Sequence, residues 1–155
     1  ELLGYVPGNR AESVFFLQFR EDLPRDDALF QRWERIFEVR AAVTKALEDA
    51  RRADLIGHSL DALVRLSAVG PLGDLLREYL EELPAVFIVS QVEWSDQLPI
   101  AATSPVLPEL RVQVERARGE KCQRCWNYSP TVGQHKTHPG LCRRCAAVIE
   151  TLAHG

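Results

Sequence analysis

The chain has 155 residues, of which 46% are hydrophobic, and its formal net charge is -3. This length and composition predict one ordinary core, or one core with a small second domain. No apolar run approaches the roughly 20 residues of a membrane span and no signal peptide is visible, so we expect a cytoplasmic protein with no membrane segment.

The start of the chain predicts a fragment of a longer protein. The first residue is Glu1, and the sequence contains no methionine, with which a translation product begins. Residues 1–25 contain several glycines and prolines, which predict an irregular segment.

A long helix is predicted after residue 25, because Asp26 or Asp27 can cap its N-terminus. Apolar residues then recur mostly at spacings of three and four, which places them on one helix face. We therefore interpret Trp33 and Phe37 as core residues rather than ligand contacts. The apolar residues of this face are Leu29, Phe30, Trp33, Ile36, Phe37, Val43, Leu47 and Ala50.

A strand and a second helix are predicted next. From residue 59 the apolar period changes to two, which is typical of a half-buried strand. Pro71 is predicted to start a helix and Pro84 to end it. The apolar run "AVFIVS" at residues 85–90 then predicts a buried strand.

A last strand completes the predicted fold, because "RVQVER" alternates and places Val112 and Val114 on one side. We expect an α+β fold. Residues 26–115 would form a long helix plus a small strand-helix-strand-strand layer, and residues 116–155 a four-cysteine module like a zinc ribbon.

The four cysteines form two Cys-x-x-Cys pairs separated by sixteen residues. Each pair delivers two sulfurs to one ion, and two pairs at about this separation are typical of a four-cysteine zinc site. Clustered thiols also favour a reducing compartment. We predict one structural zinc ion in a closed site, with no open position for hydrolytic chemistry. The predicted ligands are Cys122, Cys125, Cys142 and Cys145.

Two histidines, His135 and His138, lie between the cysteine pairs. A closed site with four cysteines needs neither of them, so we expect both to be loop residues. Iron, a mixed set of cysteine and histidine ligands, or no metal at all remain the alternatives.

The charge of the chain is unevenly distributed. Residues 116–155 carry a net charge of +5, whereas residues 1–115 carry -8. The C-terminal segment stays basic when four thiolates hold one divalent ion. This asymmetry predicts that the segment meets a polyanion, with chance clustering as the alternative.

Five side chains beside the cysteines are candidates for contact with that polyanion. Lys121, Arg124, Arg143 and Arg144 either offset the negative charge of the metal site or bind phosphates. Trp126 either packs on the cysteine turn or stacks on an unpaired base. No phosphate-binding glycine loop, GxSxG or HExxH motif, or readable carboxylate pair is present, so we predict no active site in these residues.

The stretch "GEKCQRCWNYSPTVG…HPGLCRRC" resembles the C-terminal zinc module of bacterial isoleucyl-tRNA synthetases, which are class I aminoacyl-tRNA synthetases. Upstream, "RIFEVRAAVTKALEDARRADLIGHSLDALVRL" is similar to the helix and the following segment before that module. "GYVPG…ESVFFLQF" resembles the segment after the family's anticodon-binding helices. The resemblance covers nearly the whole chain.

The resemblance implies a part of an enzyme that joins isoleucine to its tRNA using ATP. The HIGH-like and KMSKS-like signatures are missing, so ATP would bind only in a catalytic domain outside this sequence. The implied partners are the anticodon region of the isoleucine tRNA and the rest of the synthetase chain, in a monomer. Trp126 would stack on a base, and the expected phosphate or base contacts are Lys121, Arg124, Arg143 and Arg144.

Two other functions remain open. Formamidopyrimidine-DNA glycosylases carry a related zinc finger, but their finger follows a helical domain and has an arginine at its tip. Here strands are predicted upstream, and the tip offers Lys136 and histidines. The third possibility is a zinc ribbon that binds an acidic protein partner.

Overall fold

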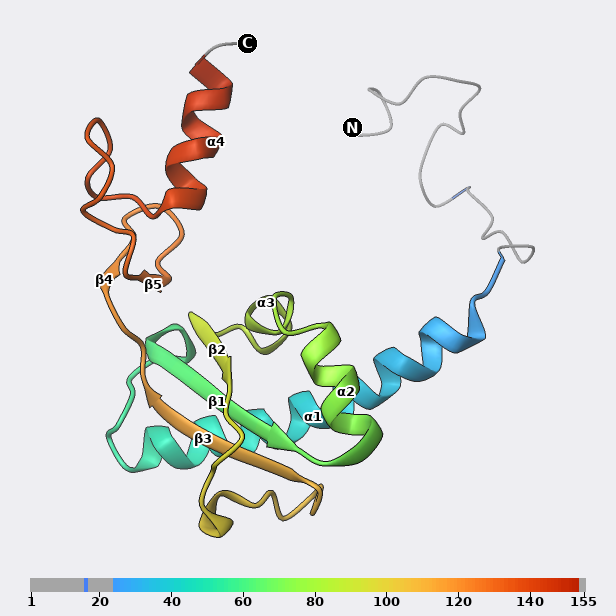
Figure 1. Ribbon diagram of the computed structural model, residues 1–155. Helices are drawn as coiled ribbons and strands as arrows, with labels where there is room; N and C mark the ends of the chain where they lie inside the picture. The colour runs from blue at the N-terminus through green and yellow to red at the C-terminus, as the bar shows by residue number, and fades with distance from the viewer. Residues whose placement is uncertain (1–15, 17–23, 154–155) are drawn as a thin grey trace.

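The computed structural model describes residue 16 and residues 24–153, so nearly all of the segment predicted to be irregular lies outside the described residues. A long helix leads into a small sheet with two short helices, and a two-stranded ribbon and a last helix follow (Figure 1). The elements are α1 (Asp27–Arg52), η3 (Ser59–Asp61), β1 (Ala62–Ala68), α2 (Gly70–Glu78), α3 (Leu83–Phe87), β2 (Gln91–Trp94), η4 (Ile100–Ala102), β3 (Leu110–Arg116), β4 (Glu120–Lys121), β5 (Tyr128–Ser129) and α4 (Arg143–Ala153). None of the described helices is long and apolar enough to cross a membrane.

Helix α1 begins where the sequence predicts, because Asp26 caps it. The Asp26 carboxylate accepts a hydrogen bond of 2.9 Å from the main-chain N–H of Leu29. This bond satisfies one of the N–H groups that a helix leaves without a partner in its first turn. At the other end, Arg51 and Arg52 lie in the last turn and offset the partial negative charge of the helix C-terminus.

Replacing Asp26 with alanine is expected to lower the free energy of unfolding by about 1 kcal/mol, because the capping acceptor is lost. Chemical denaturation followed by far-UV circular dichroism measures this change. Asp26→Asn is the matched control, since it keeps a side-chain oxygen and is expected to retain most of the stability. Equal losses in the two variants would show that the negative charge, and not the hydrogen bond, stabilises α1.

The part of α1 that follows its first turns packs on the sheet, while the N-terminal turns extend past it (Figure 1). The prediction that Phe37 belongs to the core is wrong, since this side chain is 54% exposed. It lies one position beside Ile36 on the helix, which turns it by about 100° away from the sheet. Trp33 is partly buried and packs edge-on against Tyr79. The buried residues of α1 are Ile36, Val39, Ala42, Val43, Leu47 and Ala50.

Strand β1 is the central strand of the three-stranded sheet, in the order β2-β1-β3. It runs parallel to β2 and antiparallel to β3, so that Val64 lies opposite both Val92 and Val114. The predicted strand is confirmed from Ala62 onward, where Val64 and Leu66 are fully buried and join the core that α1 and α2 complete. Its predicted first residues form η3 instead, and Leu63, on the opposite side of the strand, is also fully buried.

Helix α2 is shorter than predicted. It ends at Glu78, and Pro84 lies near the start of the separate helix α3 rather than ending α2. Proline has no N–H, and the first turn of a helix is the place where that group has no internal partner. Pro84 therefore begins a helix here, in the same way as Pro71 does in α2.

The apolar run at residues 85–90 is not a strand, and that prediction is also wrong. Its first three residues complete α3, and Ile88 then adopts a left-handed conformation that ends the helix. The strand that pairs with β1 follows as β2, which the sequence analysis did not predict. A short apolar run does not distinguish a buried helical turn from a buried strand, and Phe87 and Val89 are buried in the core either way.

The predicted α+β class is confirmed, with β2 taking the place of the strand predicted at residues 85–90. After β3, the chain passes directly into β4, which pairs with β5 in a second, two-stranded sheet. This ribbon and α4 stand beyond one end of the three-stranded sheet (Figure 1). The division of the chain at residues 25/26 and 115/116 stays a prediction.

Candidate metal centre

Four cysteine sulfurs come together between the β4–β5 ribbon and the start of α4. They all lie within 4.8 Å of one another, and the Sγ atoms of Cys125 and Cys142 are 3.8 Å apart. Four sulfurs held tetrahedrally at about 2.3 Å from one zinc ion are about 3.8 Å from each other. Cys122, Cys142 and Cys145 are buried, while Cys125 is half-buried. The cluster therefore fits one tetrahedral zinc ion.

Two tight turns position these sulfurs. In the first turn, the N–H of Trp126 donates to the carbonyl of Cys122, and the N–H of Cys122 donates to the carbonyl of Asn127, both at 2.9 Å. In the second turn, the N–H of Cys142 donates to Sγ of Cys122 at 3.3 Å. Helix α4 begins at the next residue, Arg143. The backbone of one turn thus holds a sulfur of the other.

The environment separates the pKa values of two of the thiols. Burial raises the pKa of Cys122, but hydrogen bonds from the backbone of Cys125, Cys142 and Arg124 outweigh it and lower the pKa to about 6. Burial raises the pKa of Cys142 to about 12. Because zinc binds thiolates, its binding displaces the proton of Cys142.

The two histidines predicted to be loop residues contact each other, and His135 also contacts helix α4. Nε2 of His135 lies 3.1 Å from a carboxylate oxygen of Glu150, and Nδ1 accepts a hydrogen bond of 3.2 Å from the N–H of His138. The two imidazole rings stack with centroids 5.4 Å apart. In the part of the chain that the structure describes, the cluster of possible metal ligands consists of cysteines alone.

Of the five residues predicted to contact nucleic acid, Trp126 and Lys121 lie together on the surface, and the three arginines lie beside the cysteines. Trp126 is 62% exposed, and Nζ of Lys121 lies 5.4 Å from the centroid of its indole ring. Arg124 instead reaches the metal site, where Nη1 lies 3.7 Å from Sγ of Cys145. The side chain of Cys125 raises the pKa of Arg144. Arg124, Arg143 and Arg144 are all exposed as whole residues.

Sequence reasoning missed two residues that join the ribbon to the sheet. The Oγ atom of Ser90 accepts a hydrogen bond of 2.7 Å from the N–H of Tyr128 in β5. The side-chain amide of Gln91 binds the backbone of Arg118 twice, since Oε1 accepts from its N–H at 3.0 Å and Nε2 donates to its carbonyl at 2.9 Å. Nothing in the local pattern around Ser90 and Gln91 indicates this role, because their partners lie 27 to 38 residues away.

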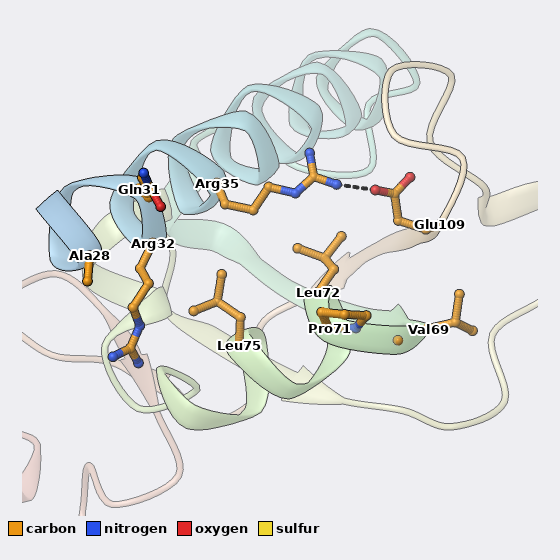
Figure 2. A pocket seen from close by; sticks show the side chains of 10 residues that line it. Ala28, Gln31, Arg32, Arg35, Val69, Pro71, Leu72, Leu75 and Glu109 are labelled. Atoms are coloured by element: carbon orange, nitrogen blue, oxygen red, sulfur yellow. Dashed lines mark hydrogen bonds and ion pairs between the residues drawn. The ribbon is translucent and has the colours of Figure 1, made fainter.

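An apolar groove of about 840 Å³ lies away from the cysteines, between the N-terminal half of α1 and the start of α2 (Figure 2). Val69, Pro71 and Leu75 line it, and the ion pair of Arg35 with Glu109 closes one side. It contains no residue that the sequence singled out for binding or catalysis.

The cysteine cluster and the ribbon around it define a four-cysteine zinc finger. Residues 119–148 match the family described as the zinc finger found in FPG and IleRS. The matched family and the geometry of the cluster together indicate a structural zinc ion.

Most of the chain is homologous to proteins named isoleucine–tRNA ligase. The chain is 50% identical over 153 residues to the ligase of Syntrophotalea carbinolica, an alignment that covers 96% of this chain and 16% of the relative. It is 44% identical over 156 residues to the ligase of Geobacter sulfurreducens, covering 97% and 17% respectively. With the ligase of Carboxydothermus hydrogenoformans, the identity is 50% over 149 residues, covering 92% and 16%.

This chain spans about one sixth of the length of these relatives. The matched region is their C-terminal part, so the chain is homologous to the C-terminal part of proteins named isoleucine–tRNA ligase. The resemblance drawn from the cysteine motif and the upstream helix is confirmed.

Proposed function

We propose that this chain is the C-terminal part of an isoleucine–tRNA ligase and binds the anticodon region of the isoleucine tRNA. The observation that carries the proposal is its similarity to proteins of that name over 96% of the chain. ATP binding and ligation of isoleucine would take place in the remainder of a longer, monomeric chain in the cytoplasm. The present residues would supply RNA affinity to that enzyme.

In this proposal, Cys122, Cys125, Cys142 and Cys145 bind one zinc ion in a closed site. Four sulfur ligands complete the tetrahedral coordination of zinc and leave no position for a reactive water molecule. The ion supplies no chemistry to the ligation. It holds the two cysteine turns together and thereby fixes the side chains on the surface of the finger.

Trp126 and Lys121 are the RNA contacts that the geometry favours most. The φ angle of Trp126 is +66°, an uncommon value for a large side chain, and its indole ring is mostly exposed. A base stacked on this ring would lie beside the ammonium group of Lys121, which would neutralise an adjoining phosphate. The net charge of +5 in residues 116–155 adds attraction for the tRNA backbone.

Replacing Trp126 with alanine is expected to weaken binding to an isoleucine tRNA anticodon stem-loop by roughly five- to a hundredfold. This loss corresponds to the stacking of one base, about 1–3 kcal/mol. Fluorescence anisotropy of a labelled stem-loop, at low ionic strength and across a salt series, measures it. Because no charge is removed, the slope of log affinity against log salt is expected to stay constant.

Phe37→Ala is the matched control for this experiment, since it removes another exposed aromatic ring, from α1. It is expected to leave RNA binding unchanged. Equal affinity of the native chain for duplex DNA would instead support the finger of a DNA glycosylase. Binding of neither nucleic acid would favour a zinc ribbon for an acidic protein partner.

A further inference from the structure

The two cysteine turns repeat one feature besides their cysteines. Each has the sequence Cys-x-Arg-Cys, with Arg124 in the first turn and Arg144 in the second. The remaining position differs, since it holds Gln123 in the first turn and Arg143 in the second. Arg124 and Arg144 each precede the second cysteine of their pair, whereas Arg143 follows the first cysteine of the second pair.

Each equivalent arginine lies near a cysteine of the opposite turn. Nη1 of Arg124, in the first turn, lies 3.7 Å from Sγ of Cys145 in the second. Arg144, in the second turn, lines one small cleft together with Cys125 of the first turn. The arrangement is reciprocal, and the contact of Arg124 ties the two turns together in addition to any bound ion.

The net charge of the zinc-bound site explains why arginines beside the sulfurs would stabilise it. Four thiolates and one divalent zinc ion carry a net charge of -2, in a place where three of the four cysteines are buried. Two guanidinium groups balance that charge. Their N–H groups also act as hydrogen-bond donors to the sulfurs, the kind of outer contact that orients metal ligands.

We propose that Arg124 and Arg144 are positioning residues of the metal site, each donating a hydrogen bond to a zinc-bound sulfur of the opposite cysteine turn. This inference rests on the proposed binding of zinc by the four cysteines. It assigns to the two arginines a role in retaining the metal, whereas Lys121, Trp126 and Arg143 stay available for RNA.

The test compares Arg124→Gln and Arg144→Gln with the control Arg143→Gln, all in the zinc-loaded chain. The control removes an adjacent positive charge and gives the second turn the sequence of the first. Release of zinc to a chromogenic chelator is expected to be about ten- to a hundredfold faster in each of the two test variants. Arg143→Gln is expected to release zinc at the native rate.

Cobalt substitution gives a second readout that does not depend on stability. Hydrogen bonds to thiolates alter the sulfur-to-cobalt charge-transfer absorption, so this band is expected to shift in Arg124→Gln and Arg144→Gln but not in Arg143→Gln. Arg144→Lys is expected to restore only part of the retention, because an ammonium group keeps the charge and loses the planar pair of donors.

The outcomes separate this inference from the function it rests on. If metal analysis of the native chain finds no bound zinc, the proposed zinc site fails. If the native chain binds one zinc ion but the test variants match it in release rate and cobalt spectrum, only the role of the arginines is overturned. Equal acceleration in Arg143→Gln would likewise overturn it, since general charge would then explain the effect.

Discussion

Removal of zinc with a chelator is expected to unfold the finger, residues 119–148, and to leave the core around β1 folded. The buried cluster of the finger consists of Cys122, Cys142 and Cys145, with Val132 and Leu141 packed against it. Ordering each residue costs about 1–2 kcal/mol, and so few apolar groups do not offset that cost. Zinc binding supplies about 10–16 kcal/mol in comparable peptides, so the ion is expected to determine whether the finger folds.

Far-UV circular dichroism and tryptophan fluorescence measure this separation. The helical signal of α1 is expected to remain after zinc removal, while the emission of Trp126 changes. Cys122→Ser is expected to reproduce the effect without a chelator, because this cysteine is fully buried and accepts the N–H of Cys142. His135→Ala is the matched control and is expected to keep its zinc. An unchanged finger after verified zinc loss would contradict the prediction.

The sequence predicts well those parts of the fold that depend on a local interaction or on one apolar face packed against one neighbouring element. The alternation around Val64 and Val114 reflects a sheet with one face against a helix, and the cap at Asp26 is a local interaction. The prediction was wrong between α2 and β2, where tertiary packing decides. There, the apolar residues 85–87 form a helical turn instead of a strand. Strand β2, which pairs with β1, has only four residues, and its alternation is too short to stand out beside the apolar run that precedes it.

The metal centre follows the same rule. Two Cys-x-x-Cys pairs predict the cluster because the geometry of each pair is local, and their separation suffices to bring the pairs together. The sulfur contact of Arg124 and the position of Arg144 near Cys125 are not predictable from spacing, since each depends on how one turn faces the other. The docking of the ribbon on Gln91 depends in the same way on side chains that meet only in the folded chain.

Gly119 lies in the connection between the three-stranded sheet and the finger, and it is expected to be the position there where substitution by alanine is most destabilising. Its φ is +87°, and a Cβ atom there would lie 2.3 Å from the carbonyl carbon of Ser129 and 2.4 Å from the nitrogen of Pro130. Both atoms belong to the backbone at β5, so no side-chain rotation relieves the clash. Gly119→Ala must therefore displace β5 from β4 at the place where Gln91 holds Arg118.

Gly133→Ala is the matched control, because Gly133 has nearly the same φ, +89°, with no atom within 4 Å of an added Cβ. The control is expected to lower the stability of the finger by about 1–2 kcal/mol, the cost of a left-handed conformation for alanine. Gly119→Ala adds overpacking of roughly 1–3 kcal/mol or more. Guanidinium unfolding followed by tryptophan fluorescence measures both. Equal destabilisation by Gly119→Ala and Gly133→Ala would show that the backbone of β5 moves aside freely and that the connection between the sheet and the finger is not rigid.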